Sequence, residues 1–347
     1  MIHKILFLDM STFDFATAES KTKMIKQSYD ASFDLTISIP TFDRIKKLKK
    51  TIESAVNQSK ESYNIIVVNN SEDLDHKIQV REVINQIKYA YISYYENNSN
   101  LGMFGNWNMC IALSKTKYCT ILNDDDTLMS NFVEIFRKFK INEYLFVSRA
   151  RIYGDGKPPF FRKLKSLLYS IKHIFQGVRN FEVMPLKKQL KGNSVHASLG
   201  VVFDVKEAIN IGGYNENHYP AADVEFSTKY ANKLGVTYCF KELGKYYHGG
   251  AYSSPNVALN CAALEYTRRK NVLINLNLKN SYLIKLGNKI NFMHYLSSVK
   301  DLNLDISEKL NLIGISEKEV LPILKNNRVA YFMWDFFSLL IYFSKRN

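Results

Sequence analysis

The sequence is poor in cysteine and lacks long apolar runs, and both shortages narrow the class of protein. Its four cysteines are scattered, without a Cys-x-x-Cys pair or zinc-type spacing, which predicts reduced and mostly buried thiols in a cytoplasmic protein. No uninterrupted apolar stretch approaches the roughly 20 residues that a membrane-spanning helix needs. The run Lys4–Leu8 is too short for a signal peptide and is followed by Asp9.

Acidic residues are scarce in one segment of an already basic chain. The formal net charge is +14, and residues 151–191 hold ten Lys or Arg side chains against two acids. Such a segment favours a polyanionic partner, which is nucleic acid, anionic lipid or a phosphorylated substrate. With 46% apolar and 13% aromatic residues, the 347-residue chain is nevertheless able to bury a substantial core.

Two amphipathic segments bear on the choice among these partners. Within residues 160–175 apolar side chains recur at helical spacing among Arg and Lys, which fits either a helix in an anionic membrane interface or a core helix with a solvated basic face. Residues 329–343 are rich in aromatic side chains and precede a basic terminus, so they form either a docking helix or a second membrane-surface element. Because the basic segment is also aliphatic, we favour an anionic membrane surface and expect no nucleic-acid partner.

Strands and helices alternate over residues 34–126. The strand patterns lie at residues 35–39, 65–68, 91–95 and 118–122, and the helical patterns at residues 44–58, 77–87 and 104–111. The run Ile65–Val68 is continuous and β-branched, as expected for a strand buried on both faces. We therefore predict an α/β fold with a mostly parallel sheet, a first strand that ends at Pro40, and a mostly helical region after residue 256.

The acidic run Asn123-Asp124-Asp125-Asp126 directly follows the last of these strands. Adjacent carboxylates repel one another, so a fold tolerates them best when a cation lies among them. At the carboxyl end of a strand in an α/β sheet, that cation would lie where ligands bind. The triplet therefore predicts either a divalent metal that holds a phosphorylated substrate or an acidic, solvated turn.

Five segments, taken in order, resemble the family-two glycosyltransferases with the GT-A fold. They are Ile37–Arg44, Ile65–Ser71, Asn100–Asn108, Asp124–Asp126 and Ile211–Asp223. They are similar to the family's Pro-Thr-x-x-Arg turn, its strand ending in Asp-Asn-x-Ser, its Asn-x-Gly segment, its Asp-x-Asp motif and its Gly-Gly-Phe-Asp-Glu stretch. The resemblance covers residues 34–250 and implies a Rossmann-like GT-A sheet flanked by helices. It also implies an inverting, metal-dependent transferase that uses a nucleotide-sugar donor.

The resemblance also implies a donor site. The residues expected to contact the nucleotide or its diphosphate are Pro40, Thr41, Arg44, Asn69, Asn70, Asn100, Gly102, Asn106, Asp124 and Asp125. Asp126, with Asp124 and His248, is expected to bind Mn²⁺ or Mg²⁺, which stabilises the charge on a departing diphosphate. Asn69 stands where the family usually has Asp facing uracil; a UDP-sugar is expected, but another base stays open because an amide both donates and accepts. Arg44 could equally be a surface residue, and His248 a structural one.

Inverting transfer needs a base that deprotonates the acceptor hydroxyl, and the resemblance assigns this role to Asp223. The same carboxylate opens a predicted helix and could instead cap it. Ala222 replaces the acid that usually precedes the base, and Glu225 is a fallback base. His196 lies in the segment that normally meets the acceptor.

These predictions divide the chain into an extension at residues 1–33, a GT-A domain at 34–250 with a basic insertion at 156–191, and a helical region at 251–347. They place the protein on the inner face of the cell membrane, where it adds a sugar to a lipid-linked or growing glycan for a surface polysaccharide. A homodimer is left open. The competing interpretation is a weak or inactive GT-A-fold partner in a membrane-bound assembly complex, which Ala222 and Asn69 would suit. Nucleotidyl transfer is disfavoured because no early glycine-rich phosphate loop is present.

Overall fold

The computed structural model describes residues 11–153, 181–184, 198–219, 221–247 and 307–308. Several predictions lie outside these residues. They are the basic amphipathic helix at 160–175, the aromatic segment at 329–343 and the helical region after 256.

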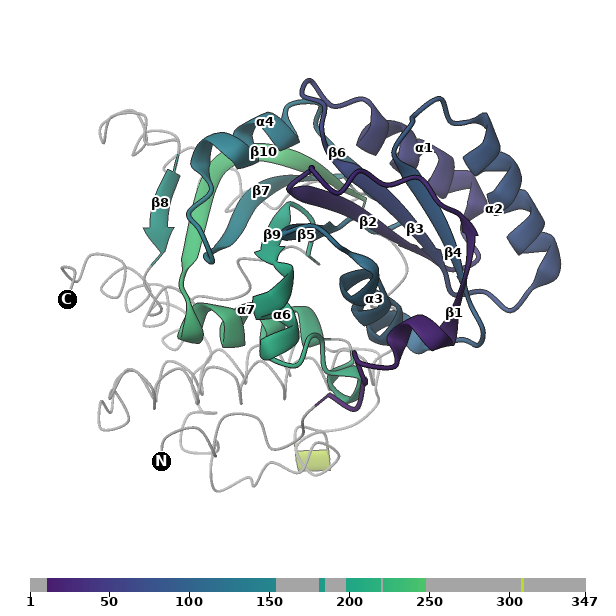
Figure 1. Ribbon diagram of the computed structural model, residues 1–347. Coiled ribbons are helices and arrows are strands. Elements are labelled where there is room, and N and C mark those ends of the chain that lie inside the picture. The colour runs from purple at the N-terminus through teal and green to yellow at the C-terminus, as the bar shows by residue number, and fades with distance from the viewer. Residues whose placement is uncertain (1–10, 154–180, 185–197, 220, 248–306, 309–347) are drawn as a thin grey trace.

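The described strands form one ten-stranded sheet, in the order β1-β4-β3-β2-β5-β9-β7-β10-β6, with β8 paired to β10 (Figure 1). Their bounds are β1 Thr22–Lys26, β2 Leu35–Thr41, β3 Asn64–Asn69, β4 Ile92–Asn97, β5 Tyr118–Ile121, β6 Thr127–Leu128, β7 Leu145–Tyr153, β8 Phe181–Met184, β9 Val201–Asp204 and β10 Val236–Tyr247. Strands β4, β3, β2 and β5 are parallel neighbours, and β7 is parallel to β10. The other pairings are antiparallel. The predicted α/β fold with a largely parallel core is confirmed.

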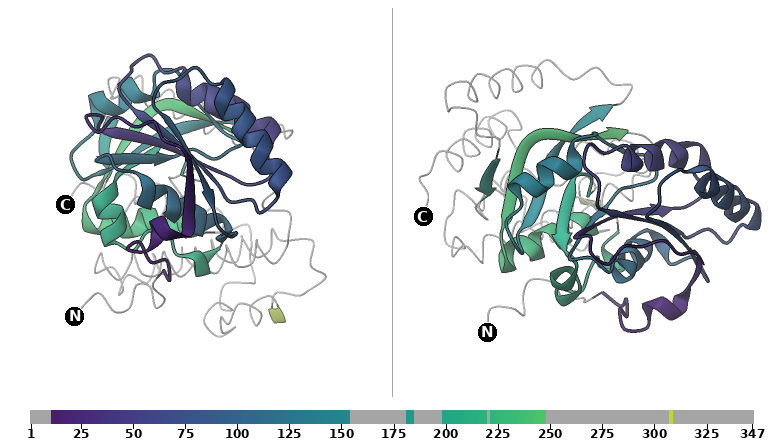
Figure 2. Two further views of the ribbon diagram at one scale, coloured as in Figure 1. Left: turned by 45° about the vertical axis from the view of Figure 1, so that its right-hand side comes forward. Right: turned by 45° about the horizontal axis from the view of Figure 1, so that its top comes forward.

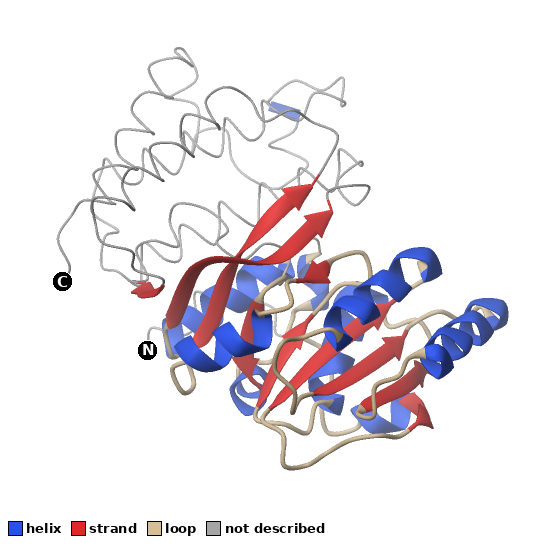
Figure 3. Cartoon of the chain, turned by 90° about the horizontal axis from the view of Figure 1, so that it is seen from above, coloured by secondary structure: helices blue, strands red, loops and turns tan. Residues whose placement is uncertain are grey.

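Helices cover both faces of this sheet, as Figures 2 and 3 show from three directions. One face carries α1 Ile45–Val56, α2 Leu74–Gln86 and α4 Phe132–Phe139. The other carries α3 Gly102–Leu113, α6 Val205–Asn210 and α7 Ala222–Lys233, with the short 3₁₀ turns η1 Ala18–Lys21 and η3 Glu216–His218 packed beside them. The helices predicted at residues 44–58, 77–87 and 104–111 are therefore confirmed as α1, α2 and α3.

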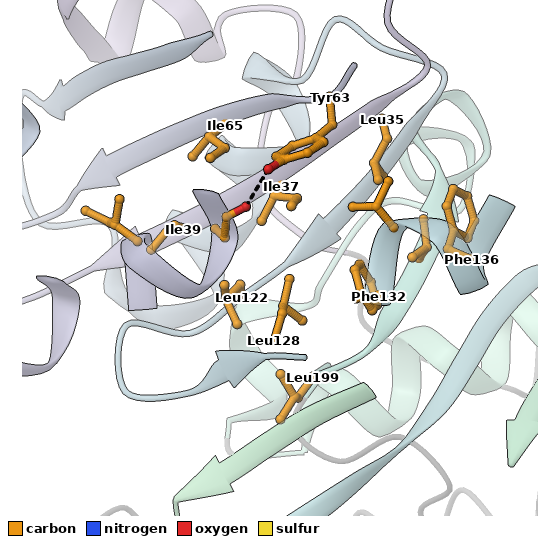
Figure 4. Close-up of a cluster of buried hydrophobic side chains, with 14 of the residues drawn as sticks. Leu35, Ile37, Ile39, Tyr63, Ile65, Leu122, Leu128, Phe132, Phe136 and Leu199 are labelled. Atoms are coloured by element: carbon orange, nitrogen blue, oxygen red, sulfur yellow. Dashed lines mark hydrogen bonds between the residues drawn. The ribbon is translucent and has the colours of Figure 1, made fainter. Parts of the chain in front are cut away.

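Alternation along each strand divides the apolar side chains between two cores. Ile65 and Val67 of β3 face the core under α1, α2 and α4, whereas Ile66 and Val68 face the core over α3. Figure 4 shows part of the first core, where Leu35 and Ile37 of β2 lie near Phe132 and Phe136 of α4. Both β3 faces are buried, so its continuous apolar run is explained by burial on two sides.

Pro40 does not end the first strand, because β2 continues through it to Thr41. The β2–β5 ladder stops at the Ser38–Ile121 pair, followed by the hydrogen bond from Leu122 N–H to Ser38 C=O. Along a strand, alternate residues direct their polar backbone groups toward the same neighbour, so Pro40 faces the side where β5 has already ended. The missing N–H of Pro40 therefore breaks no ladder hydrogen bond, and the prediction was wrong at this residue.

The segment before the first predicted strand contributes a strand of its own. β1 pairs antiparallel with β4, and Phe13, Phe15 and Ala18 pack against the core on the α3 face. This edge strand was not predicted from its sequence Thr-Lys-Met-Ile-Lys, which is only partly buried.

Candidate active site

The site is built where the parallel strands end. Because β2, β3, β4 and β5 run in the same direction, their carboxyl ends meet at one edge of the sheet, where α/β folds bind ligands. The segments that follow these strands carry Thr41–Arg44, Asn70–Asp73, Asn98–Leu101 and Asn123–Asp126. Most of the predicted donor-site residues are therefore brought to one edge.

Asp124 is bound by the segment that follows β2. Its Oδ2 accepts hydrogen bonds from Thr41 Oγ1 (3.0 Å) and from the Phe42 N–H (3.1 Å), and its Oδ1 accepts from Arg44 Nη1 (3.3 Å). Burial raises the pKa of Asp124 to about 6, against the opposing effects of the Phe42 amide and the Arg44 guanidinium. Thr41 and Arg44, which were predicted to flank the nucleotide, both hydrogen-bond this carboxylate in the structure.

Asp126 is fully buried and is held by β10. Its Oδ1 accepts the Tyr247 N–H at 3.0 Å, and its carbonyl accepts Thr51 Oγ1 of α1 at 2.8 Å. Its Oδ2 is buried and has no hydrogen-bond partner among the described residues. Burial raises the pKa of Asp126 to about 7, although the Tyr247 hydrogen bond acts in the opposite direction.

Asp125 lies between these two and points toward basic side chains. Its Oδ2 is 3.0 Å from Arg44 Nη1 and 3.8 Å from Lys47 Nζ. Arg44 therefore bridges Asp124 and Asp125 with a single nitrogen. Arg44 is the residue before the first turn of α1, and its side chain is 48% exposed.

Asn69 is buried, and its amide is committed on both sides. Its Nδ2 donates to Tyr94 Oη (3.0 Å), and its Oδ1 accepts the Ser71 N–H (3.0 Å). The Tyr94 hydroxyl also hydrogen-bonds Glu96. The two oxygens of Glu96 in turn accept hydrogen bonds from Arg81 Nε (2.8 Å) and Nη2 (2.7 Å). The Asn69 amide is thus one end of a polar chain that reaches the surface of α2.

The other predicted asparagines form a network around the start of α3. Asn70 Nδ2 donates to Asn100 Oδ1 (2.7 Å), while Asn97 Nδ2 donates to Asn70 Oδ1 and to Asn106 Oδ1. Gly102 has φ +71°, a left-handed conformation that glycine adopts without strain, and its N–H donates to Asn100 Oδ1. These residues shape the loop between β4 and α3.

Asp223 is buried in the first turn of α7, where a negative charge is favourable to the helix dipole. The cap position belongs to Ala221, which makes no side-chain cap hydrogen bond, so Asp223 is not the helix cap. The fallback base, Glu225, is occupied differently. Its Oε1 is 2.6 Å from Lys229 Nζ and its Oε2 contacts His218 Nδ1.

Two neighbouring tyrosines were missed by the sequence analysis. The Tyr247 N–H holds Asp126, a backbone contact that no side-chain pattern announces. Burial raises the pKa of Tyr246, and the charges of Asp126, Asp125 and Asp223 raise it further, so this phenol lies within the field of both predicted sites. Asn97 was also missed, although its place at the end of a predicted strand could have marked it.

The donor atoms fit a hard divalent cation that takes part of its ligands from a substrate. Within the described ranges no group of three or more His, Cys, Asp or Glu side chains is arranged to hold a metal. Asp124 and Asp126 supply carboxylate oxygens, and the unpartnered Oδ2 of Asp126 is the oxygen best able to serve. Mg²⁺ commonly binds through one or two carboxylates plus substrate phosphates. His248 and His196 lie outside the described residues.

Sequence comparison defines the class of protein. The family described as "Glycosyl transferase family 2" matches residues 36–197, which include the turn after β2, the asparagine network and the acidic triplet. This part of the chain, a little under half of its length, is similar to that family.

Two curated relatives share part of this region. An uncharacterized glycosyltransferase of Rickettsia bellii (strain RML369-C) is 30% identical over 146 residues, covering 41% of this chain and 20% of that protein. The GalNAc(5)-diNAcBac-PP-undecaprenol beta-1,3-glucosyltransferase of Campylobacter jejuni is 32% identical over 124 residues, covering 35% and 37%. The matches thus span less than two fifths of either relative.

Solved structures share the fold. S. aureus TarS in complex with UDP has a TM-score of 0.52 at 13% identity, covering 88% of this chain and 92% of that chain. The mannosyltransferase PcManGT from Pyrobaculum calidifontis, in complex with GDP-Man and Mn²⁺, has a TM-score of 0.52 at 11% identity, covering 94% and 91%. The fold is GT-A. Separately, none of the helices in the described part of the chain has the length and apolar character to cross a membrane.

Proposed function

We propose that this protein is an inverting glycosyltransferase that uses Mn²⁺ or Mg²⁺ and a nucleoside-diphosphate sugar, with a UDP-sugar as the first choice. One observation carries the proposal. The buried Asp126 has a carboxylate oxygen without a hydrogen-bond partner in the described part of the chain, and it follows Asp124 at the carboxyl edge of the parallel strands, inside the segment matched by the family. A buried acceptor without a partner is costly, so a cation there accounts for its retention.

The structural neighbours support the donor class. One was solved with UDP and another with GDP-Man and Mn²⁺, so both uracil and guanine are tested first. Asn69 leaves this choice open, because its amide is bound by Tyr94 and Ser71.

The acceptor is proposed as a hydroxyl of a lipid-linked or growing glycan in surface-polysaccharide synthesis. The Campylobacter relative supports this, since its name specifies a PP-undecaprenol-linked glycan. Such an acceptor is held in a membrane, which agrees with the proposed position on its cytoplasmic face.

The carboxylates of the proposed site have separate roles in the reaction. Asp124 and Asp126 hold the cation, which when bound supplies positive charge to the departing diphosphate. Asp223 accepts the proton of the acceptor hydroxyl as the new C1–O bond forms and the bond from C1 to the phosphate oxygen breaks. The electron pair of the broken bond leaves with the diphosphate, and the anomeric carbon is inverted because the hydroxyl attacks from the face opposite the diphosphate.

The test is a screen of UDP- and GDP-sugars for thermal stabilisation and for hydrolysis that depends on Mn²⁺. We expect one donor to raise the Tm of the wild type and to be hydrolysed slowly, and Asp126→Ala to abolish both effects. If no nucleotide sugar binds, or if Asp126→Ala behaves like the wild type, the proposal fails.

A second variant separates donor binding from transfer. Asp223→Asn is expected to keep donor binding and to lower transfer to an added acceptor by at least about 10²-fold, the contribution of a positioned base. Retained transfer would exclude Asp223 as the base. Donor binding without hydrolysis or transfer in the wild type would instead indicate an inactive GT-A-fold partner.

A further inference from the structure

Arg44 covers the carboxylates of the proposed donor site with positive charge. Its Nη1 donates to Asp124 Oδ1 (3.3 Å) and to Asp125 Oδ2 (3.0 Å), and Lys47 Nζ lies 3.8 Å from the same Asp125 oxygen. The side chains of Arg44 and Lys47 are 48% and 55% exposed, so both can turn without disturbing a packed element. The protein therefore carries its own mobile counter-charges at the metal-binding carboxylates.

A divalent cation that arrives alone meets two obstacles. It comes close to a guanidinium and an ammonium, which repel it in a partly buried setting. It also finds few ligand atoms, because Asp124 Oδ2 already accepts two hydrogen bonds and Asp126 Oδ1 accepts one. Two buried carboxylates with such commitments make a weak site for a free cation.

A diphosphate removes both obstacles at once. Its oxygens supply the ligands that the described residues lack. Its negative charge also offers Arg44 and Lys47 a better partner than the carboxylates, since guanidinium–phosphate hydrogen bonds are charge-assisted. Binding of the cation and of the diphosphate should therefore reinforce each other.

We infer that Arg44 is an internal counter-cation that couples metal binding to diphosphate binding. It neutralises Asp124 and Asp125 until a metal–nucleotide complex enters, and it then transfers its hydrogen bonds to the diphosphate. The site consequently takes up the metal–nucleotide complex in preference to the free cation. The inference rests on the proposed function, and it gives Arg44 two successive partners, first the two carboxylates and then the diphosphate.

The experiment measures Mn²⁺ affinity by electron paramagnetic resonance, without nucleotide and with saturating UDP or GDP. The ratio of the two affinities is the coupling factor, and it must be the same when nucleotide affinity is measured with and without Mn²⁺. For the wild type we expect a factor of at least about ten, within the usual range for linked sites.

Three variants decide the role of Arg44. Arg44→Gln should bind Mn²⁺ alone several-fold more tightly, bind nucleotide more weakly and move the coupling factor toward one. Arg44→Lys keeps the charge and should keep the weak binding of Mn²⁺ alone. Lys46→Gln is the matched control, because Lys46 is exposed on the same turn of α1 and is not among the basic residues that pair with the carboxylates in the described part of the chain; its coupling factor should equal that of the wild type.

Two outcomes overturn the inference. One is an unchanged coupling factor in Arg44→Gln, and the other is weaker binding of Mn²⁺ alone together with a loss of Tm, which would indicate a structural role. In both cases the wild type still binds the metal–nucleotide complex, and the proposed function stands. A wild type that binds neither Mn²⁺ nor nucleotide overturns the proposed function itself.

Discussion

At the scale of single residues, the acidic triplet is not uniform. Asp125 is ion-paired at the rim, Asp124 accepts three hydrogen bonds, and Asp126 is buried with one oxygen that has no hydrogen-bond partner among the described residues. Of the three carboxylates, Asp126 therefore has the most to gain from a bound cation.

Asp126→Asn is therefore expected to stabilise the metal-free protein while it destroys the site. At pH 8 the substitution removes a buried charge but keeps an oxygen for the Tyr247 N–H, so the Tm should rise by about 2 °C or more. The increase in Tm that Mn²⁺ and nucleotide give the wild type should disappear. Differential scanning fluorimetry measures both.

Asp125→Asn is the comparison for this prediction. Its carboxylate is paired with Arg44 and Lys47, so neutralising it should leave the Tm unchanged or slightly lower. A lower Tm for Asp126→Asn, combined with an intact response to Mn²⁺, would contradict the assignment of Asp126.

Asn69 illustrates how a neighbour can dictate a residue type. Asn69→Asp would match the usual family residue, yet it should lower stability by about 1–3 kcal/mol because Tyr94 loses its amide donor and a second carboxylate enters beside Glu96. Calorimetric unfolding measures the loss. In a Glu96→Gln background the cost should be smaller, and an equal cost in both backgrounds would refute this explanation.

At the scale of elements, α4 is fastened to the beginning of β2 by charge. Arg137 Nη2 and Lys140 Nζ donate to the two oxygens of Asp34 at 2.9 and 2.7 Å. Burial alone would raise the pKa of Asp34, but these hydrogen bonds outweigh it and the pKa is lowered. This pair of contacts orients the helix whose Phe132 and Phe136 fill the first core.

Asp34→Asn should therefore weaken the protein in a pH-dependent way. Because the folded pKa is below the unfolded one, the stabilisation is present at neutral pH and is lost as the pH falls through the folded pKa. The pair is about one third exposed, so solvent screening limits the loss at pH 7 to about 1 kcal/mol. Urea unfolding of wild type and variant should differ at pH 7 and converge as the pH falls below the folded pKa of Asp34; a difference that persists there would refute the ionic origin.

The elements that can be predicted from the sequence are those whose formation depends on residues close together in the chain. The helices α1, α2 and α3 and the strands β2 to β5 follow from periodicity and burial on two faces, which a short window of sequence contains. β1 is a short, half-exposed edge strand, and its pairing with β4 joins residues about 70 positions apart. Pro40 looked like a strand end because the point where β5 stops is invisible from the neighbourhood of β2.

The site was predictable to a similar degree. Motifs placed Asp124, Asp126 and Arg44 at strand ends, and the structure brings them to the same edge of the sheet, while their roles stay predictions. Their partners Tyr247 and Thr51 were not found, because a backbone N–H and a buried hydroxyl from distant segments carry no local signal. Asn69 and Asn70 were correctly placed at the edge, but their mutual commitments with Tyr94 and Asn97 depend on the tertiary fold.

At the scale of the whole molecule, charge is the dominant property. The net charge of +14 predicts that the full chain binds vesicles containing phosphatidylglycerol and does not bind purely zwitterionic vesicles. Flotation measures the bound fraction, which should fall strongly at roughly 0.5 M NaCl, where charges separated by more than a few ångströms are screened.

Substituting the Lys and Arg residues of 162–172 by Gln tests whether the basic segment is responsible. The variant should lose most of its binding to anionic vesicles and keep its response to Mn²⁺ and nucleotide. Undiminished binding would assign the membrane contact to another part of the chain.

The N–H that donates to Asp126 belongs to Tyr247, the last residue of β10, and the last hundred residues of the chain follow directly after it. A pull or a twist applied after residue 247 acts on the final amide of β10, and through that amide on the carboxylate with the bare oxygen. We therefore expect sequence changes after residue 247 to alter the affinity of the proposed cation at Asp126 through this backbone hydrogen bond.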